Sequence, residues 1–276
     1  MSFVISSLQN KFVKSAAGLK QKKHRDELGQ FMAEGVRLCE ELAASEWQID
    51  TCFFTGSAAQ DDRTLRVLDT LRNKGCSLFE VSASVLDKIA ETEEPQGIIV
   101  IARQRKMSIK ELLSLVKVPL IAVLDDVRDP GNAGTIIRTA DAAGCNGVIF
   151  LKGCADLYAG KTIRATMGSL FHLPVIEGVA RSELVAAKQD YGIKLAVTSL
   201  TAAQRYYEAD LTGALALVFG SESQGISAEV TEASQSRIFI PMLGKAESLN
   251  VAAAAAVILY EAVVSHDDPR FLVADI

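Results

Sequence analysis

Six short apolar runs in the C-terminal part of the chain limit most strongly what it can fold into. Most of their positions are apolar, without the alternation of a half-buried strand, and helical patterns separate them. The runs are residues 120–124, 147–151, 173–176, 194–198, 214–219 and 237–240. Continuous apolar strands are typical of a parallel sheet that helices bury on both faces. The sequence therefore predicts an α/β fold with a mostly parallel sheet in this part.

The segments between these runs have the apolar spacing of helices. The predicted helices are residues 133–143, 161–168, 181–191, 228–233 and 248–264, with a less distinct helical segment at 203–208. Ser248 is of a residue type that commonly caps a helix N-terminus, so we expect it to begin the last helix. The alanines at 252–256 favour close packing of that helix.

Residues 1–103 also alternate between strands and helices, which predicts a small α/β sandwich as a first domain. The expected strands are 31–33, 51–55, 78–81 and 97–101, and the expected helices are 8–28 (interrupted at Gly18), 34–45 and 61–74. A polar, charged segment at 104–118 is predicted to be a linker, because Pro119 ends its short helical run. The second domain then spans 119–276.

The net charge of −5 hides an uneven distribution of charge along the chain. Residues 1–117 contain 17 Lys and Arg against 16 Asp and Glu, whereas residues 118–276 contain 12 against 18. Six basic residues and no acid lie between Lys11 and Arg25. Such a cluster can neutralise nucleic-acid phosphates. It can equally be a solvated helix surface, and charge alone favours this second interpretation.

Several classes of protein are disfavoured by missing patterns. The longest uncharged stretch of the C-terminal part, 248–260, is shorter than the roughly 20 residues of a membrane-spanning helix. The N-terminus lacks the apolar core of a signal peptide, and five cysteines without a C-x-x-C pair fit a reducing, cytoplasmic compartment. The three histidines are dispersed, so no metal site is expected, and we expect His172 to be a core residue. The glycine patterns of NAD-binding, ATP-binding and serine-hydrolase folds are absent.

Three loops that follow predicted strands combine Gly with polar side chains. They are residues 125–134, 219–226 and 240–250. Ligands of open α/β sheets bind beyond the carboxyl ends of the strands. Each loop also leads to a helix whose first N–H groups are free to meet a ligand. We therefore expect the functional site at these three loops.

Together the loops resemble the motifs of the SpoU (TrmH-like) RNA 2′-O-ribose methyltransferases of the SPOUT superfamily. Residues 132–144 match the pattern N-x-G-x-I-x-R-T-A-x-A-x-G, residues 220–225 match G-x-E-x-x-G, and residues 240–251 match I-P-M followed by S-L-N-V. The N-terminal part resembles the substrate-binding domain common in this family, whose fold is shared with RNA-binding ribosomal proteins. That likeness rests on the run K-K-H-R at 22–25 and on residues 31–37.

The resemblance implies S-adenosylmethionine as cofactor, a trefoil knot in the second domain and a homodimer. The cofactor is expected to be held largely by backbone groups in the knotted loops. The residues that the resemblance places there are Thr198, Leu200, Gly220, Ile240, Met242 and Leu249.

Arg138 carries the sharpest functional hypothesis. By resemblance it lies near the target ribose and helps to remove the proton of the 2′-hydroxyl. Because an arginine pKa lies above 12, a role in binding phosphate, orienting the hydroxyl and stabilising the forming alkoxide is easier to defend than a role as base. The alternative is a surface ion pair with Asp141, three residues further along a helix.

Four other residues are candidates for the active site. Asn132 and Asn250 would position the ribose, or serve as turn and cap residues. Ser248 would lie in the active site and cap the last helix, two compatible roles. Glu222 would face cofactor or substrate, or serve a helix N-terminus.

RNA is the expected partner, and DNA is not, because the methyl acceptor is a ribose 2′-hydroxyl. Large-subunit ribosomal RNA is favoured as substrate, with transfer RNA as the alternative. A non-catalytic RNA-binding protein with the same fold is the rival from another class. The residues expected to contact RNA are Lys14, Lys20, Lys22, Lys23, Arg25 and Arg37.

Overall fold

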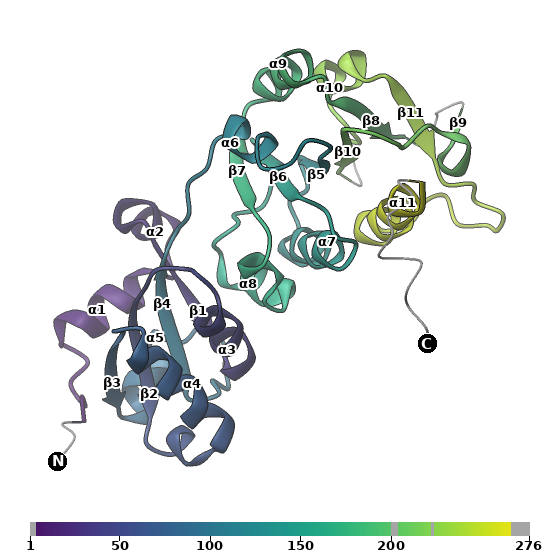
Figure 1. Cartoon of the computed structure of the whole chain (residues 1–276). Helices are drawn as coiled ribbons and strands as arrows, with labels where there is room; N and C mark the ends of the chain where they lie inside the picture. The colour runs from purple at the N-terminus through teal and green to yellow at the C-terminus, as the bar shows by residue number, and fades with distance from the viewer. Residues whose placement is uncertain (1–3, 200–203, 222–223, 266–276) are drawn as a thin grey trace. The chain divides into compact units, whose positions relative to one another are not determined.

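Two units make up the chain in the computed structural model, which describes residues 4–199, 204–221 and 224–265 (Figure 1). Unit 1 comprises Met1–Arg105 and Asp156–His172, and unit 2 comprises Lys106–Ala155 and Leu173–Ile276. The domain limits drawn from the sequence stay a proposal. The two units differ from them in one main respect, because Asp156–His172 belongs with the N-terminal residues.

The sheet of unit 1 is mixed and has the strand order β1-β4-β2-β3. Its strands are β1 (Gln30–Glu34), β2 (Ile49–Thr55), β3 (Ser77–Val81) and β4 (Ile98–Arg103). β4 pairs antiparallel with β1 and with β2, and β2 pairs parallel with β3. β4 is a continuous apolar run because every residue from Ile98 to Ala102 is buried.

The helices of unit 1 flank this sheet. They are α1 (Lys11–Gly18), α2 (Lys22–Leu28), α3 (Val36–Ala44), α4 (Asp62–Asn73) and α5 (Ala83–Ile89). α1 and α5 bury apolar residues against Met32, Phe53 and Ile99 of the sheet, and α3 packs against α4. The sequence pattern did not separate α5, which Ser82 caps by accepting a hydrogen bond from the Val85 N–H at 3.4 Å.

An aromatic cluster anchors Asp156–His172 in unit 1. This segment contains α8 (Gly160–Thr166) and a 3-10 turn, η2 (Ser169–Phe171). The ring of Tyr158 lies 5.1 Å from that of Phe31, and the ring of Phe171 lies 5.6 Å from that of Trp47. Trp47 therefore serves packing. The expectation of a core histidine at 172 is wrong, because the His172 side chain is 43% exposed and bonds Glu41 at 3.2 Å.

The sheet of unit 2 is parallel throughout and has the order β7-β6-β5-β10-β8-β11-β9. Its strands are β5 (Leu120–Asp125), β6 (Gly147–Leu151), β7 (Val175–Val179), β8 (Lys194–Thr198), β9 (Gln204–Arg205), β10 (Leu215–Gly220) and β11 (Ser236–Phe239). The six predicted strands are all present, and the parallel sheet is confirmed. The trefoil knot stays a prediction of the resemblance, with which this strand order is compatible.

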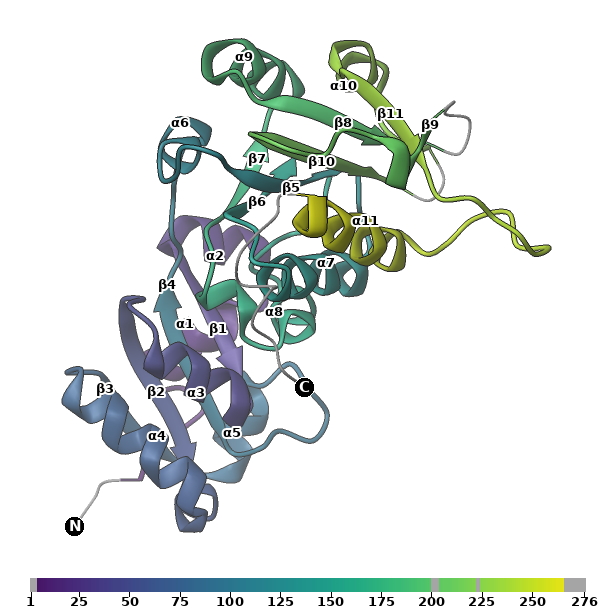
Figure 2. The ribbon, with the colours of Figure 1, turned by 45° about the vertical axis from the view of Figure 1, so that its right-hand side comes forward.

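Helices cover both faces of this sheet, which explains the continuous apolar strands (Figures 1 and 2). α7 (Pro130–Ala142) and α11 (Val251–Ser265) pack side by side on one face. α6 (Ile109–Leu113), α9 (Arg181–Tyr191) and α10 (Ala228–Ala233) lie on the other, where they bury Leu112, Leu184 and Val230. No helix in the part of the chain that the structure describes is long and apolar enough to cross a membrane.

Two local predictions differ from the structure. The α-helix expected in the indistinct segment at 203–208 is not present over the described residues 204–208, which form β9 and a 3-10 turn at Tyr206–Glu208. The last helix begins at Val251 and not at Ser248, because the Asn250 side chain provides its cap. Ser248 is thus an exposed loop residue, and the expected capping role is wrong.

Candidate cofactor and RNA site

A cavity of about 510 Å³ opens at the carboxyl edge of the sheet in unit 2. Its walls come from the ends of β8, β10 and β11 and from the first turns of α11. Six residues singled out from the sequence line it: Thr198, Gly220, Ile240, Met242, Ser248 and Leu249. Two of the three motif loops therefore share one cavity, whose volume lies within the range of small-molecule sites.

The lining of this cavity fits a ligand with a flat apolar part and several polar groups. Phe239, Leu249 and Ile258 provide apolar surface, and Ser221 and Gln224 provide polar side chains. The Thr198 hydroxyl is held by a hydrogen bond to the Val218 carbonyl at 3.2 Å. These features suit the adenine ring, ribose and amino-acid part of S-adenosylmethionine.

Gly220 is needed because the backbone folds back against it. A Cβ atom at this position would lie 2.3 Å from the carbonyl carbon and 2.5 Å from the oxygen of Gly225. The turn is closed by two backbone hydrogen bonds between Ser221 and Gly225, at 3.1 and 2.9 Å. The G-x-E-x-x-G spacing is thus explained by the close approach of its first and last residues.

Asn132 and Asn250, from the first and third motifs, are joined directly. The Asn250 amide donates to Asn132 Oδ1 at 2.9 Å, and Asn250 Oδ1 accepts from the backbone N–H of Ala252 at 2.9 Å. The asparagine of α7 is not its cap, since Asp129 accepts from the Asn132 N–H at 2.8 Å. The pair therefore ties the start of α7 to the start of α11, next to the cavity residue Leu249.

Arg138 lies on the exposed side of α7. Within residues 4–199, 204–221 and 224–265, its guanidinium makes no ion pair with Asp141, which is the alternative that the sequence had left open. The Arg138 side chain is exposed, as a contact with an RNA phosphate would require. Glu222 and Leu200, also singled out from the sequence, lie outside the described residues.

Four of the basic residues expected to contact RNA are exposed on unit 1: Lys14, Lys20, Lys23 and Arg37. Lys23 forms a surface ion pair with Glu27 at 3.8 Å. Lys22 is less available for RNA, because its ammonium group forms ion pairs with Asp26 at 3.6 Å and with Asp156 at 3.3 Å. The exposed lysines lie on and between α1 and α2.

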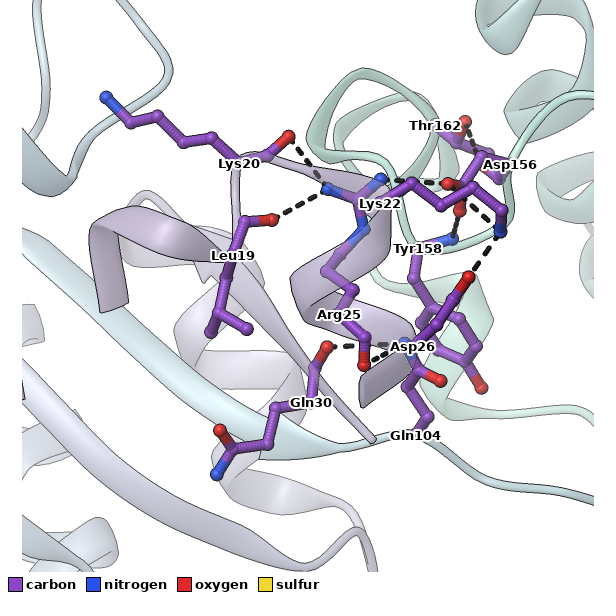
Figure 3. Close-up of polar contacts among 10 residues, drawn as sticks. All are labelled: Leu19, Lys20, Lys22, Arg25, Asp26, Gln30, Gln104, Asp156, Tyr158 and Thr162. Atoms are coloured by element: carbon purple, nitrogen blue, oxygen red, sulfur yellow. Dashed lines mark hydrogen bonds and ion pairs between the residues drawn. The ribbon is translucent and has the colours of Figure 1, made fainter. Parts of the chain in front are cut away.

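Arg25 does not fit the RNA contact expected of it (Figure 3). Only 5% of the residue is exposed, and its guanidinium donates to the carbonyls of Leu19 at 2.7 Å and Lys20 at 3.0 Å and to Asp156 at 2.8 Å. Burial opposes ionisation of Asp156, but the hydrogen bond and charge of Arg25, with Lys22, outweigh it and lower the pKa of this carboxyl. Arg25 is an internal link of unit 1 and is not part of the proposed RNA surface.

Sequence reasoning passed over Asp125, which stands in register with the cavity residue Gly220, and its partner Arg181. Asp125 is fully buried and accepts two hydrogen bonds from Arg181, from Nε at 3.0 Å and from Nη2 at 2.7 Å. The available signal was a carboxylate that ends an otherwise apolar strand. An ion in such a place needs a partner inside the protein.

Comparisons with known proteins show the family of this chain. The model of the SpoU rRNA Methylase family matches residues 119–260, and that of the MRM3-like substrate binding domain matches residues 10–100. The 23S rRNA (guanosine(2553)-2′-O)-methyltransferase RlmP of Bacillus subtilis is 36% identical over 256 residues, which are 93% of this chain and 97% of that protein.

Solved structures of rRNA and SpoU methyltransferases are also similar to this chain. The AdoMet-bound rRNA methyltransferase of Sinorhizobium meliloti has a TM-score of 0.83 and 33% identity, covering 95% of this chain and 97% of its own. The SpoU methyltransferase AviRb of Streptomyces viridochromogenes, in complex with AdoMet, has a TM-score of 0.84 and 28% identity, covering 93% and 98%. The resemblance drawn from the three motifs is thereby confirmed, and the chain belongs to the SpoU rRNA methylase family.

Proposed function

We propose that this protein transfers the methyl group of S-adenosylmethionine to a ribose 2′-hydroxyl in large-subunit ribosomal RNA. One observation carries the proposal: the loops after β10 and β11 form one cavity, and the Asn132–Asn250 pair ties the third motif loop to the first beside it. Membership of the SpoU family supports the reaction, and the name of the RlmP relative supports 23S-type RNA as substrate.

The cofactor would be held in the cavity. Phe239, Leu249 and Ile258 would pack against its apolar part, and the backbone at Gly220 and Ile240 would recognise its polar groups. Bound there, the cofactor supplies the electrophilic methyl group. Apolar walls keep water away from the reacting atoms, and this strengthens the electrostatic interactions of the site.

Arg138 would act on the RNA rather than as a base. Its guanidinium would bind a backbone phosphate through two parallel hydrogen bonds. This fixes the 2′-hydroxyl and stabilises the negative charge that grows on its oxygen as the proton leaves for a phosphate oxygen or water. Asn132, Asn250 and Ser248 would orient the ribose between Arg138 and the cavity.

Unit 1 would supply affinity for RNA. Lys14, Lys20, Lys23 and Arg37 present charge to solvent on this unit, and phosphate contacts of this kind bind without reading sequence. Recognition of the RNA therefore divides between a basic surface on unit 1 and the ribose site on unit 2. Transfer RNA is the alternative substrate.

A homodimer would form through the outer face of α11. Apolar side chains recur there at helical spacing and are exposed: Val257 (37%), Tyr260 (41%) and Val264 (62%). An apolar stripe on a helix is typical of a contact between subunits. The expected compartment is the cytoplasm, in which the five cysteines would stay reduced.

The proposal is tested by incubating the protein with radiolabelled S-adenosylmethionine and unmodified transcripts of large-subunit rRNA or tRNA. Label in rRNA, and none with Arg138→Ala, is the expected result. Label in tRNA alone would establish the alternative substrate. A folded protein that binds RNA but neither binds the cofactor nor transfers label would support the non-catalytic rival.

A further inference from the structure

A buried carboxylate lies next to the cavity and has no role in the mechanism so far. Asp125 ends β5, is fully buried, and stands in register with Gly220 on the neighbouring strand β10. Gly220 lines the cavity, whereas Asp125 does not. Keeping a charge in such a place is costly unless all its lone pairs are satisfied. The hydrogen-bond partners of Asp125 therefore indicate which part of the chain the carboxylate positions.

Each oxygen of Asp125 has its own partner. Oδ1 accepts from Nε and Nη2 of Arg181, at 3.0 and 2.7 Å, and Oδ2 accepts from the backbone N–H of Ser227 at 2.9 Å. The hydrogen bond to Asp125 raises the pKa of Arg181, so this guanidinium stays charged at any ordinary pH. Arg181 is the first residue of α9. Arg181 therefore fixes the carboxylate through Oδ1, and the carboxylate fixes the Ser227 backbone through Oδ2.

Ser227 marks the far end of the turn that forms one wall of the cavity. The turn leaves β10 at Gly220, and Ser221, Gln224, Gly225 and Ile226 line the cavity before the chain reaches Ser227. Strand β10 fixes the start of the turn at Gly220, and Asp125 fixes its end at Ser227. The Ser227 hydroxyl is buried and has no hydrogen-bond partner among the described residues, so it is the backbone N–H that makes the link.

We propose that Asp125, held by Arg181, is a positioning residue that sets the cavity wall Gln224–Ile226, through Ser227, in the conformation that binds S-adenosylmethionine. The inference rests on the proposed function, because it takes the cavity to be the cofactor site. The carboxylate acts through the Ser227 N–H and touches no substrate. Loss of this link should weaken cofactor binding and leave RNA binding as it was.

Ser227 offers a matched pair of variants. Its φ of −57° lies in the range of proline, so Ser227→Pro removes the N–H, and the ring Cδ that replaces the hydrogen separates the turn from the Asp125 carboxylate. Ser227→Ala removes the unpartnered hydroxyl, keeps the N–H and sets the reference. Titration calorimetry with S-adenosylmethionine on the full-length chain should give a Kd at least tenfold higher for Ser227→Pro than for Ser227→Ala. The KM for the cofactor should rise in parallel, with an unchanged KM for RNA.

The possible results distinguish a failure of the positioning role of Asp125 from a failure of the proposed methyl transfer. Equal cofactor affinity in the two folded variants would overturn the positioning role, although the proposed function would stand. A wild-type protein that does not bind the cofactor would overturn both. If Ser227→Pro does not fold, Arg181→Lys decides: lysine keeps the charge but loses the paired hydrogen bonds. We then expect a cofactor Kd at least threefold higher, and an unchanged Kd would contradict the inference.

Discussion

Replacing Gly220 by alanine tests whether the close approach of Gly220 and Gly225 shapes the cofactor site. The added Cβ would lie 2.3 Å from the carbonyl carbon of Gly225, 2.5 Å from its oxygen and 2.6 Å from the N atom of Ile226. All three are backbone atoms, so no side chain can rotate out of the way. The turn itself must move outward from the strand.

The size of the effect follows from this geometry. Overpacking by a single methyl group costs about 1–3 kcal/mol. If the turn takes up the displacement, this energy is lost from cofactor binding, and the Kd rises about 5- to 150-fold because 1.4 kcal/mol equals a factor of ten. If β10 moves instead, the same energy appears as a lower melting temperature.

Gly244→Ala is the matched control, because a Cβ at Gly244 would have no atom within 4 Å. Titration calorimetry with S-adenosylmethionine and thermal unfolding of both variants separate binding from stability. We expect Gly220→Ala to lose affinity by at least fivefold and Gly244→Ala to bind like the wild type. A Gly220→Ala protein with normal affinity and normal stability would refute the argument that the turn requires glycine here.

Three further predictions concern unit 1. Arg25→Met should lower the free energy of unfolding by about 3 kcal/mol in urea melts, since it leaves the Asp156 carboxylate with the exposed Lys22 and the Tyr158 N–H but without its buried cation. Lys23→Met should change the free energy of unfolding by less than about 0.5 kcal/mol; similar losses in the two variants would contradict the buried link. Because the pKa of Asp156 is lowered in the folded protein, it contributes stability that is fully present above the unfolded value of 3.8 and is lost as the pH falls through the folded value. The free energy of unfolding should therefore fall less steeply between about pH 5 and 2.5 in Arg25→Met than in the wild type. Equal slopes would assign the loss of stability in acid to other groups. Changing Lys14, Lys20 and Lys23 together to Gln should flatten the salt dependence of RNA binding, measured by filter binding. The slope of log K against log salt concentration should fall by about 0.7–0.9 for each phosphate that a lysine no longer neutralises. An unchanged slope would move the RNA surface away from α1 and α2.

Most of the sheet in unit 2 was predictable because its signal is local. A strand buried on both faces is apolar along its length, so β5 and β10 could be found without knowing their neighbours. The site could be located for a similar reason: the motif residues Gly220, Ile240 and Leu249 lie in loops at strand ends and meet in one cavity.

The parts that escaped prediction depend on partners far away in the sequence. Arg25 looks like one more member of a basic run, and its ion pair with Asp156, 131 positions further on, has no local signal in the sequence. Likewise Ser248 and Asn250 are both good capping residues, and local pattern cannot tell which will begin α11. The bond from Asn250 to Asn132, across 118 positions, favours Asn250.

The central claim is that a ribose 2′-hydroxyl accepts the methyl group. The most direct measurement maps the labelled nucleotide by mass spectrometry of digested RNA and then repeats the reaction on a transcript carrying a single 2′-deoxy substitution at that position. We predict that the mass increase lies on the ribose and that the deoxy substrate binds but takes up no methyl group. Methyl transfer to the deoxy transcript, or a mass increase on the base, would contradict the account.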